Sequence, residues 1–127
     1  MARALFSIKP KFARLILSGE KRCEYRRRLP ARPVSDIAIY ATNPVSRVIG
    51  EAKVEAVLFL EKEELWQQTC LYGGISRKEF DSYFCGLEKA GALLLSHPVV
   101  YDRSLSIEEM GAIRPPQSFC YLGDQYE

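Results

Sequence analysis

The chain has 127 residues, of which 47% are hydrophobic and 27% are charged, and its formal net charge is +2. These values are typical of a soluble globular protein, and the length suits one domain, residues 1–127, with a hydrophobic core of its own. They exclude a membrane-spanning helix, since the longest apolar run, residues 90–95, is far shorter than the roughly 20 residues that a bilayer requires.

The charges are distributed unevenly along the chain. Residues 1–32 contain ten of the 18 Lys and Arg residues but only two of the 16 Asp and Glu residues. Such asymmetry predicts a cationic face that meets phosphate or another anion. The first residues have no signal-peptide pattern, because Arg3, Lys9 and Lys11 border a short apolar run. We therefore expect a cytoplasmic protein.

In chain order, the first predicted elements are a short strand at residues 4–8 and a helix that begins at Pro10 and ends at residues 18–19. An apolar stripe at i, i+3 and i+4 supports the helix, and proline suits its first turn. Residues 22–28 alternate as a strand does, which places Glu24 and Arg26 on one face.

The rest of the chain predicts four further strands and three short helices. Ser76 and Glu79 form a capping box, which is a specific signal for a helix start. The pattern as a whole predicts an α+β protein, a small mixed β-barrel of five to six strands with inserted helices. The predicted strands are 37–41, 48–59 (with a bulge at Gly50), 91–101 and 119–122, and the predicted helices are 62–72, one after Ser76 and a short turn after Ser106.

Metal and cofactor sites are not expected. The cysteines are scattered, with no Cys-x-x-Cys pair, and there is one histidine, His97. Zinc sites need closely spaced Cys and His ligands, so the cysteines are best interpreted as reduced structural thiols. These cysteines are Cys23, Cys70, Cys85 and Cys120.

Three segments carry a resemblance to a known family. Residues 7–10 (Ser-Ile-Lys-Pro), 16–21 (Ile-Leu-Ser-Gly-Glu-Lys) and 24–27 (Glu-Tyr-Arg-Arg) resemble the ASCH domain family, which belongs to the PUA-like superfamily of small RNA-associated β-barrels. Residues 115–119 (Pro-Pro-Gln-Ser-Phe) resemble the tail of its prokaryotic stand-alone members. The resemblance implies a ligand cleft beside the first helix, lined by the Gly-x-Lys loop and the strand after it.

One bacterial branch of that family hydrolyses N4-acetylcytidine with the Lys, the second Thr and a distant Glu of the motif Gly-x-Lys-Thr-x-Thr-x-Arg. Lys21 and Arg26 match this motif. The chain departs from it where Arg22 and Glu24 replace the two threonines, and where the distant Glu falls near Gly73. A carboxylate cannot take the part of a hydroxyl, so hydrolysis of acetylcytidine is an alternative here rather than the leading expectation.

The residues themselves support two interpretations of Lys21. A lysine beside a cation has a lowered pKa, and a carboxylate partner raises it again. If the site is buried, Lys21 could act as nucleophile or base, with Glu24 as its proton partner. In the other interpretation, Lys21, Glu24 and Arg26 form an ion-pair strip on the surface, which contributes little.

We therefore expect an RNA- or nucleotide-binding domain with a cationic ligand cleft, whose ligand is RNA, a nucleotide or a modified nucleoside. Glu24 would orient Lys21 or accept a hydrogen bond from a base amino group. One alternative is a small hydrolase of RNA or of a modified nucleoside, with Lys21 and Glu24 as catalytic residues. Another is a module that docks on protein or DNA through its basic face. The expected ligand contacts are Lys9, Lys21, Glu24, Arg26, Tyr40, Gln117 and Ser118.

Overall fold

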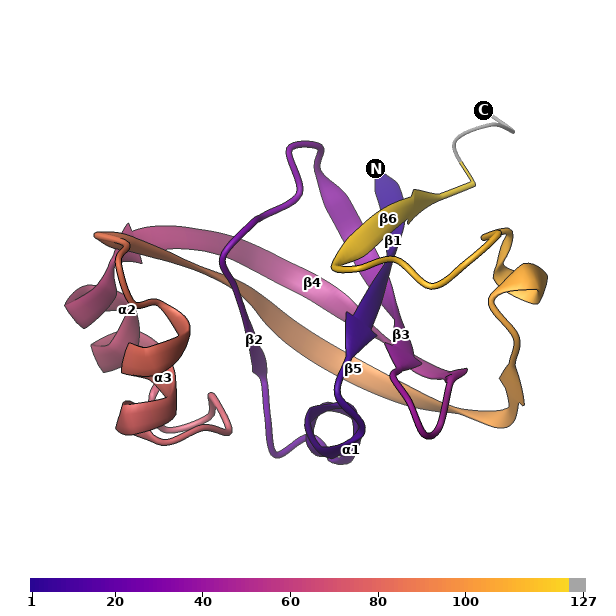
Figure 1. Cartoon of the computed structure of the whole chain (residues 1–127), viewed down its shortest axis with the longest axis horizontal. Helices are drawn as coiled ribbons and strands as arrows, with labels where there is room; N and C mark the ends of the chain where they lie inside the picture. Colours follow the sequence, from indigo (N-terminus) through magenta and orange to yellow (C-terminus); the bar gives the residue numbers. More distant parts are fainter. Residues whose placement is uncertain (124–127) are drawn as a thin grey trace.

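The structure is a computed structural model that describes residues 1–123. One mixed sheet of six strands, in the order β2-β5-β4-β3-β1-β6, forms the body of the molecule (Figure 1). Among the strand pairs within residues 1–123, β1–β3 is parallel and the others are antiparallel. The strands are β1 (Ala2–Ile8), β2 (Cys23–Arg26), β3 (Val34–Ala41), β4 (Arg47–Glu61), β5 (Lys89–Leu105) and β6 (Phe119–Leu122), and the helices are α1 (Pro10–Ser18), α2 (Lys62–Thr69), α3 (Arg77–Tyr83) and the 3₁₀ turn η1 (Glu108–Met110).

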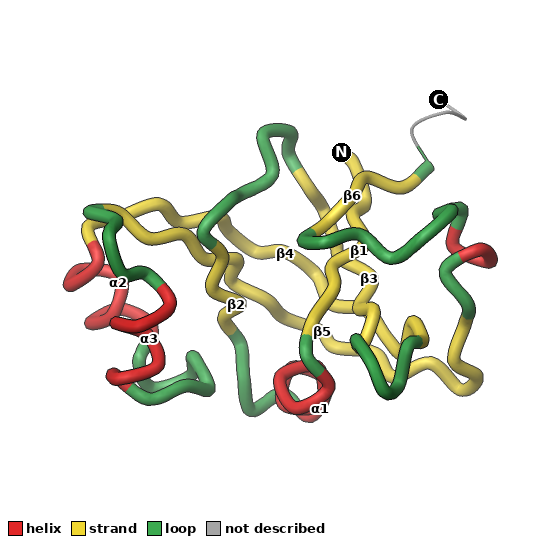
Figure 2. The backbone as a smooth tube through the Cα atoms, in the orientation of Figure 1, coloured by secondary structure: helices red, strands yellow, loops and turns green. Residues whose placement is uncertain are grey.

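The long strands β4 and β5 form a twisted ribbon across the molecule, with α2 and α3 at one end of it (Figures 1 and 2). Register shifts bend the ribbon, and one of them lies at Gly50, as the sequence predicts. A Cβ at Gly50 would lie 2.5 Å from the carbonyl oxygen of Val99, so only glycine fits this close approach.

The predicted α+β fold, with a mixed sheet and inserted helices, is confirmed, but the sheet does not close into the expected barrel. Among the described residues, β2 and β6 remain its two edges. β2 has only four residues and pairs with β5 alone. To close the barrel, the free edge of β2 would have to pair with the other edge strand, β6. Side-chain hydrogen bonds from Arg26, and not backbone hydrogen bonds, connect these two sides of the sheet.

Two hydrophobic clusters position the site. The first contains Ala13 and Ile16 of α1 and residues from β1, β3 and β5. The second lies beneath α2 and α3, where Phe80 and Phe84 surround the ring of Tyr25 from β2 at centroid distances of 5.2 and 6.0 Å. The second cluster therefore fixes β2 against α3.

Some predicted boundaries differ from the structure. The helix predicted at 62–72 ends at Thr69, because the chain then turns through Gly73 and Gly74, and Gly74 has φ +75°. β5 continues through Pro98 to Leu105, because the register shift leaves His97 and Pro98 without partners on β4. Within residues 1–123, none of the helices has the length and apolar content that a membrane span requires.

The capping box of α3 gives the first testable prediction. The Ser76 hydroxyl accepts a hydrogen bond from the Glu79 N–H at 3.1 Å, and the Glu79 carboxylate accepts one from the Ser76 N–H at 2.9 Å. Ser76→Ala should lower the free energy of unfolding by about 1 kcal/mol, measured by urea denaturation. Ser82→Ala, on the same helix, is the matched control and should change it by less than about 0.5 kcal/mol. Equal effects of the two substitutions would contradict the cap.

Candidate functional site

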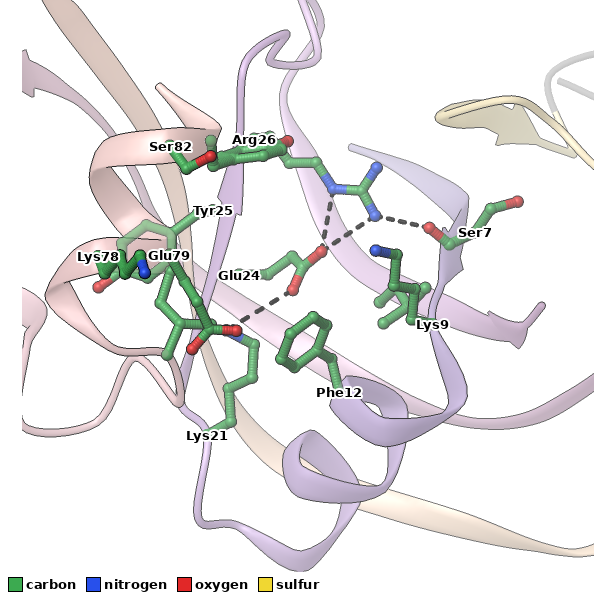
Figure 3. Close-up of a pocket in the computed structure, with 13 residues that line it drawn as sticks. Ser7, Lys9, Phe12, Lys21, Glu24, Tyr25, Arg26, Lys78, Glu79 and Ser82 are labelled. Atoms are coloured by element: carbon green, nitrogen blue, oxygen red, sulfur yellow. Dashed lines mark hydrogen bonds and ion pairs between the residues drawn. The ribbon is translucent and has the colours of Figure 1, made fainter. Parts of the chain in front are cut away.

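A pocket of about 550 Å³ opens between β2, the junction of β1 with α1, and α3 (Figure 3). Lys21, Glu24 and Arg26 line it, and their exposed fractions are only 2%, 7% and 8%. The three charged groups predicted to share a cleft therefore lie together in a buried place, which excludes the surface ion-pair strip.

Lys21 enters the pocket from the turn between α1 and β2. Its ammonium donates a hydrogen bond to the carbonyl oxygen of Gly73 and lies 5.4 Å from the ring centroid of Phe12 and 5.1 Å from that of Tyr25. Burial lowers the pKa of Lys21, and the nearby charge of Glu24 offsets part of this effect. The ammonium is thus held by a carbonyl and two rings, where each of its contacts is stronger than it would be in water.

The carboxylate of Glu24 has one occupied and one available oxygen. Its Oε2 accepts a hydrogen bond from Nε of Arg26 at 3.1 Å and forms an ion pair with Nη2 of the same guanidinium at 3.0 Å. Its Oε1 lies 3.9 Å from Nζ of Lys21, which is too far for a hydrogen bond. Within the described residues Oε1 has no hydrogen-bond donor, and it faces the pocket (Figure 3). A ligand with an N–H or O–H group can therefore bind there.

Arg26 links the two sides of the open sheet. Besides Glu24, its guanidinium donates to the Ser7 carbonyl of β1 at 2.8 Å and to the hydroxyl of Ser118, just before β6, at 3.1 Å. Its Cζ lies 4.8 Å from the ring centroid of Phe6. Most of its N–H groups donate hydrogen bonds within the protein. Arg26 therefore stabilises the floor of the pocket, which is formed by Lys21, Glu24 and Arg26, and leaves few donors for a ligand.

The other predicted contacts divide into three groups. Lys9 lines the pocket from an exposed position at the start of α1, and Ser118 touches the site through Arg26. Gln117 is exposed and does not line the pocket. The structure does not bring Tyr40 there either, because its ring packs in a core cluster with Leu5 and Val48.

The sequence interpretation missed the wall that α3 contributes. Lys78, Ser82 and Tyr83 line the pocket opposite Lys9, and the i, i+4 spacing of Lys78 and Ser82 puts those two on one face of the helix. The capping box at Ser76 fixes where this helix starts, so the grouping was recognisable. Its partner β2 lies some 50 residues earlier in the chain, and no local pattern reveals such a contact.

Gly73 contributes a backbone carbonyl where the resemblance places an acidic side chain. A Cβ at Gly73 would lie 2.2 Å from the hydroxyl oxygen of Tyr25. That hydroxyl is hydrogen-bonded to Oγ1 of Thr69 at 2.6 Å, and both side chains are buried. No side chain therefore fits at this position while Tyr25 holds its place. Among residues 1–123, no three Cys, His, Asp or Glu side chains are grouped so that they could hold a metal ion.

The fold and the pocket together define a class, a small α+β domain with a buried Gly-x-Lys site beside its first helix. Residues 6–96 match the family model of the ASCH domain, and the chain belongs to the ASCH domain family. It is 39% identical, over 94% of its own length and 83% of the relative's, to an ASCH domain-containing ribonuclease of Zymomonas mobilis.

A solved structure and a longer relative extend this comparison. The crystal structure of ASCH from Zymomonas mobilis superimposes with a TM-score of 0.85 and 36% identity, covering 97% of this chain and 89% of that one. The chain also matches the large ribosomal subunit protein uL22 of Ureaplasma parvum at 29% identity, over 93% of this chain but only 38% of that protein.

Removal of the Arg26 guanidinium should destabilise the fold strongly. Arg26→Met leaves the carboxylate of Glu24 buried without its hydrogen-bonded partner, and breaking a buried pair in this way costs about 3–5 kcal/mol. Arg27→Met, one residue along and exposed, should change the free energy of unfolding by less than about 0.5 kcal/mol. Chemical denaturation of both variants measures the difference. A loss below about 1 kcal/mol for Arg26→Met would contradict the linking role.

Proposed function

We propose that this domain binds RNA and that its pocket receives one nucleotide unit. The observation that carries the proposal is the buried carboxylate of Glu24, flanked by Lys21 and Arg26, with one oxygen free of hydrogen bonds at the floor of a pocket of about 550 Å³. This volume lies within the range of small-ligand pockets. We also propose, from the sequence, that residues 1–127 form one domain and that the protein is cytoplasmic.

The floor of the pocket offers a hydrogen-bond donor and an acceptor next to each other. Nζ of Lys21 and Oε1 of Glu24 are 3.9 Å apart, and every nucleobase carries a donor and an acceptor side by side on its Watson–Crick edge. Tyr83 adds an aromatic wall that is 39% exposed. The ribonuclease name of the Zymomonas mobilis relative supports RNA as the ligand class.

A second candidate is RNA cleavage, which the name of that relative favours. In such a reaction the Glu24 carboxylate would take the proton of a 2′-hydroxyl, whose oxygen attacks the adjacent phosphorus. Lys21 would stabilise the charge that develops on the phosphoryl oxygens and donate a proton to the departing 5′-oxygen. The products would be a 2′,3′-cyclic phosphate and a free 5′-hydroxyl.

Substitution at the floor tests the binding proposal. With a fluorescent single-stranded 2′-O-methyl oligonucleotide, which cannot be cleaved through its 2′-oxygen, Lys21→Met and Glu24→Gln should each weaken binding about tenfold or more, since a hydrogen bond to a charged group contributes about 1.5–3 kcal/mol. Lys53→Gln, an exposed position on β4 outside the pocket, is the control. Unchanged affinity in both floor variants, with their folding intact, would refute the proposal.

The same variants decide between binding and cleavage. Incubation of the parent with unmodified RNA should give fragments that end in a cyclic phosphate if the second candidate holds, and Glu24→Gln should abolish them. RNA that stays intact with the parent, at concentrations where it is fully bound, would rule out cleavage and leave binding as the activity.

The pH dependence of binding should report the pKa of Lys21. Burial lowers that pKa below its ordinary value of 10.5, so the ammonium is lost at a lower pH than that of an exposed lysine. Affinity for the 2′-O-methyl probe should therefore fall as the pH rises, beginning below 10.5. Lys21→Arg keeps its charge throughout this range, so its binding, even if weaker, should not show this fall. Parallel pH profiles of the two proteins, measured by fluorescence anisotropy, would contradict the assignment.

A further inference from the structure

The floor of the pocket is poorly suited to a phosphate group. The guanidinium of Arg26 already donates hydrogen bonds to Glu24, to the Ser7 carbonyl and to the Ser118 hydroxyl. Lys21 already donates to the Gly73 carbonyl. The open position at the floor is a carboxylate oxygen, Oε1 of Glu24, which repels an anion and attracts an N–H or O–H group. The neutral, hydrogen-bonding part of a nucleotide fits this place better than its charged part.

Free cations lie instead at the rim. Lys9, at the start of α1, and Lys78, on α3, line the pocket from exposed positions, and Figure 3 shows them on opposite sides of Glu24. Neither forms an ion pair within the described residues. Glu79, beside Lys78, has its carboxylate engaged by the Ser76 N–H of the capping box. The rim therefore presents, among the described residues, one ammonium without an ion-pair partner on each side of the opening.

This arrangement specifies how a nucleotide would be bound. We infer that the ligand is an internal nucleotide of a single strand, inserted base-first, with its two flanking phosphates against Lys9 and Lys78. This inference rests on the RNA-binding function proposed above. The base meets Lys21 and Oε1 of Glu24 at the floor. A strand that crosses the opening carries a phosphate on each side of the inserted base, which matches the two separate ammonium groups.

Two classes of ligand are disfavoured by the same geometry. A free nucleotide brings a phosphate to one side only, so it leaves one rim lysine without a partner. A duplex keeps its base edges paired and stacked, and they cannot reach side chains that are less than a tenth exposed at the pocket floor. Single-stranded RNA satisfies the floor and both sides of the rim together.

A length series combined with salt titration tests this inference. The probes are 2′-O-methyl forms of one nucleoside, its 5′-monophosphate, a trinucleotide centred on it, a nonamer and the nonamer duplex. Affinity should rise clearly from the monophosphate to the trinucleotide and fall at least tenfold from the single strand to the duplex.

The rim lysines have a specific signature in the salt dependence. The slope of log affinity against log salt concentration for the single-stranded nonamer should become shallower by about 0.7 in Lys9→Gln and in Lys78→Gln, and by about 1.4 in the double variant, because each phosphate contact releases counterions. Lys53→Gln removes the same charge from β4 outside the pocket and should leave the slope unchanged.

The outcomes separate this inference from the function on which it rests. If Lys21→Met and Glu24→Gln weaken binding but Lys9→Gln and Lys78→Gln leave the slope as it is, RNA binding stands and the base-first arrangement is wrong. A monophosphate that binds as tightly as the trinucleotide, or a duplex that binds as tightly as the single strand, overturns the arrangement as well. If the floor variants bind the nonamer as the parent does, the proposed function itself fails.

Discussion

The ion pair between Glu24 and Arg26 is the interaction on which the site depends. A carboxylate that is 7% exposed needs a partner with several donors, and a guanidinium supplies them in one plane. Arg26 uses the remaining donors on β1 and on the segment before β6. One side chain thus neutralises the pocket floor and joins the two sides of a sheet that backbone hydrogen bonds leave open.

The helices α2 and α3, inserted between β4 and β5, also help to build the pocket. The loop after α2 brings the Gly73 carbonyl to the ammonium of Lys21, and the hydroxyl pair of Thr69 and Tyr25 holds that loop against β2. Helix α3 then supplies the outer wall with Lys78 and Tyr83. The insertion is therefore a component of the pocket as well as a cover for the second hydrophobic cluster.

The sequence predicts the parts of this site that local patterns encode. Strand alternation places Glu24 and Arg26 on one face, the Gly-Glu-Lys turn brings Lys21 beside them, and the structure shows all three lining one pocket. The sequence does not predict which elements face these three residues. The α3 residues that line the same pocket lie more than 50 residues later in the chain, and no local pattern reveals a contact over that distance. Tyr40 illustrates the same limit. Its place at the end of an apolar strand suits either a core or a pocket, and packing against Leu5 and Val48 decides for the core.

Two of the three departures from the amidohydrolase motif, at Glu24 and at Gly73, lie beside Lys21. Where that branch has an acidic side chain near position 73, the ring of Tyr25 leaves no room for a Cβ, and where it has a threonine this chain has Glu24. The pocket thus keeps one lysine and one carboxylate, but the carboxylate comes from β2 and is paired with Arg26. No threonine hydroxyl is left beside Lys21 at that position. A site with a fixed carboxylate and a nearby ammonium, without that hydroxyl, favours recognition of a base or transfer of a proton from a 2′-hydroxyl over attack on an acetyl amide.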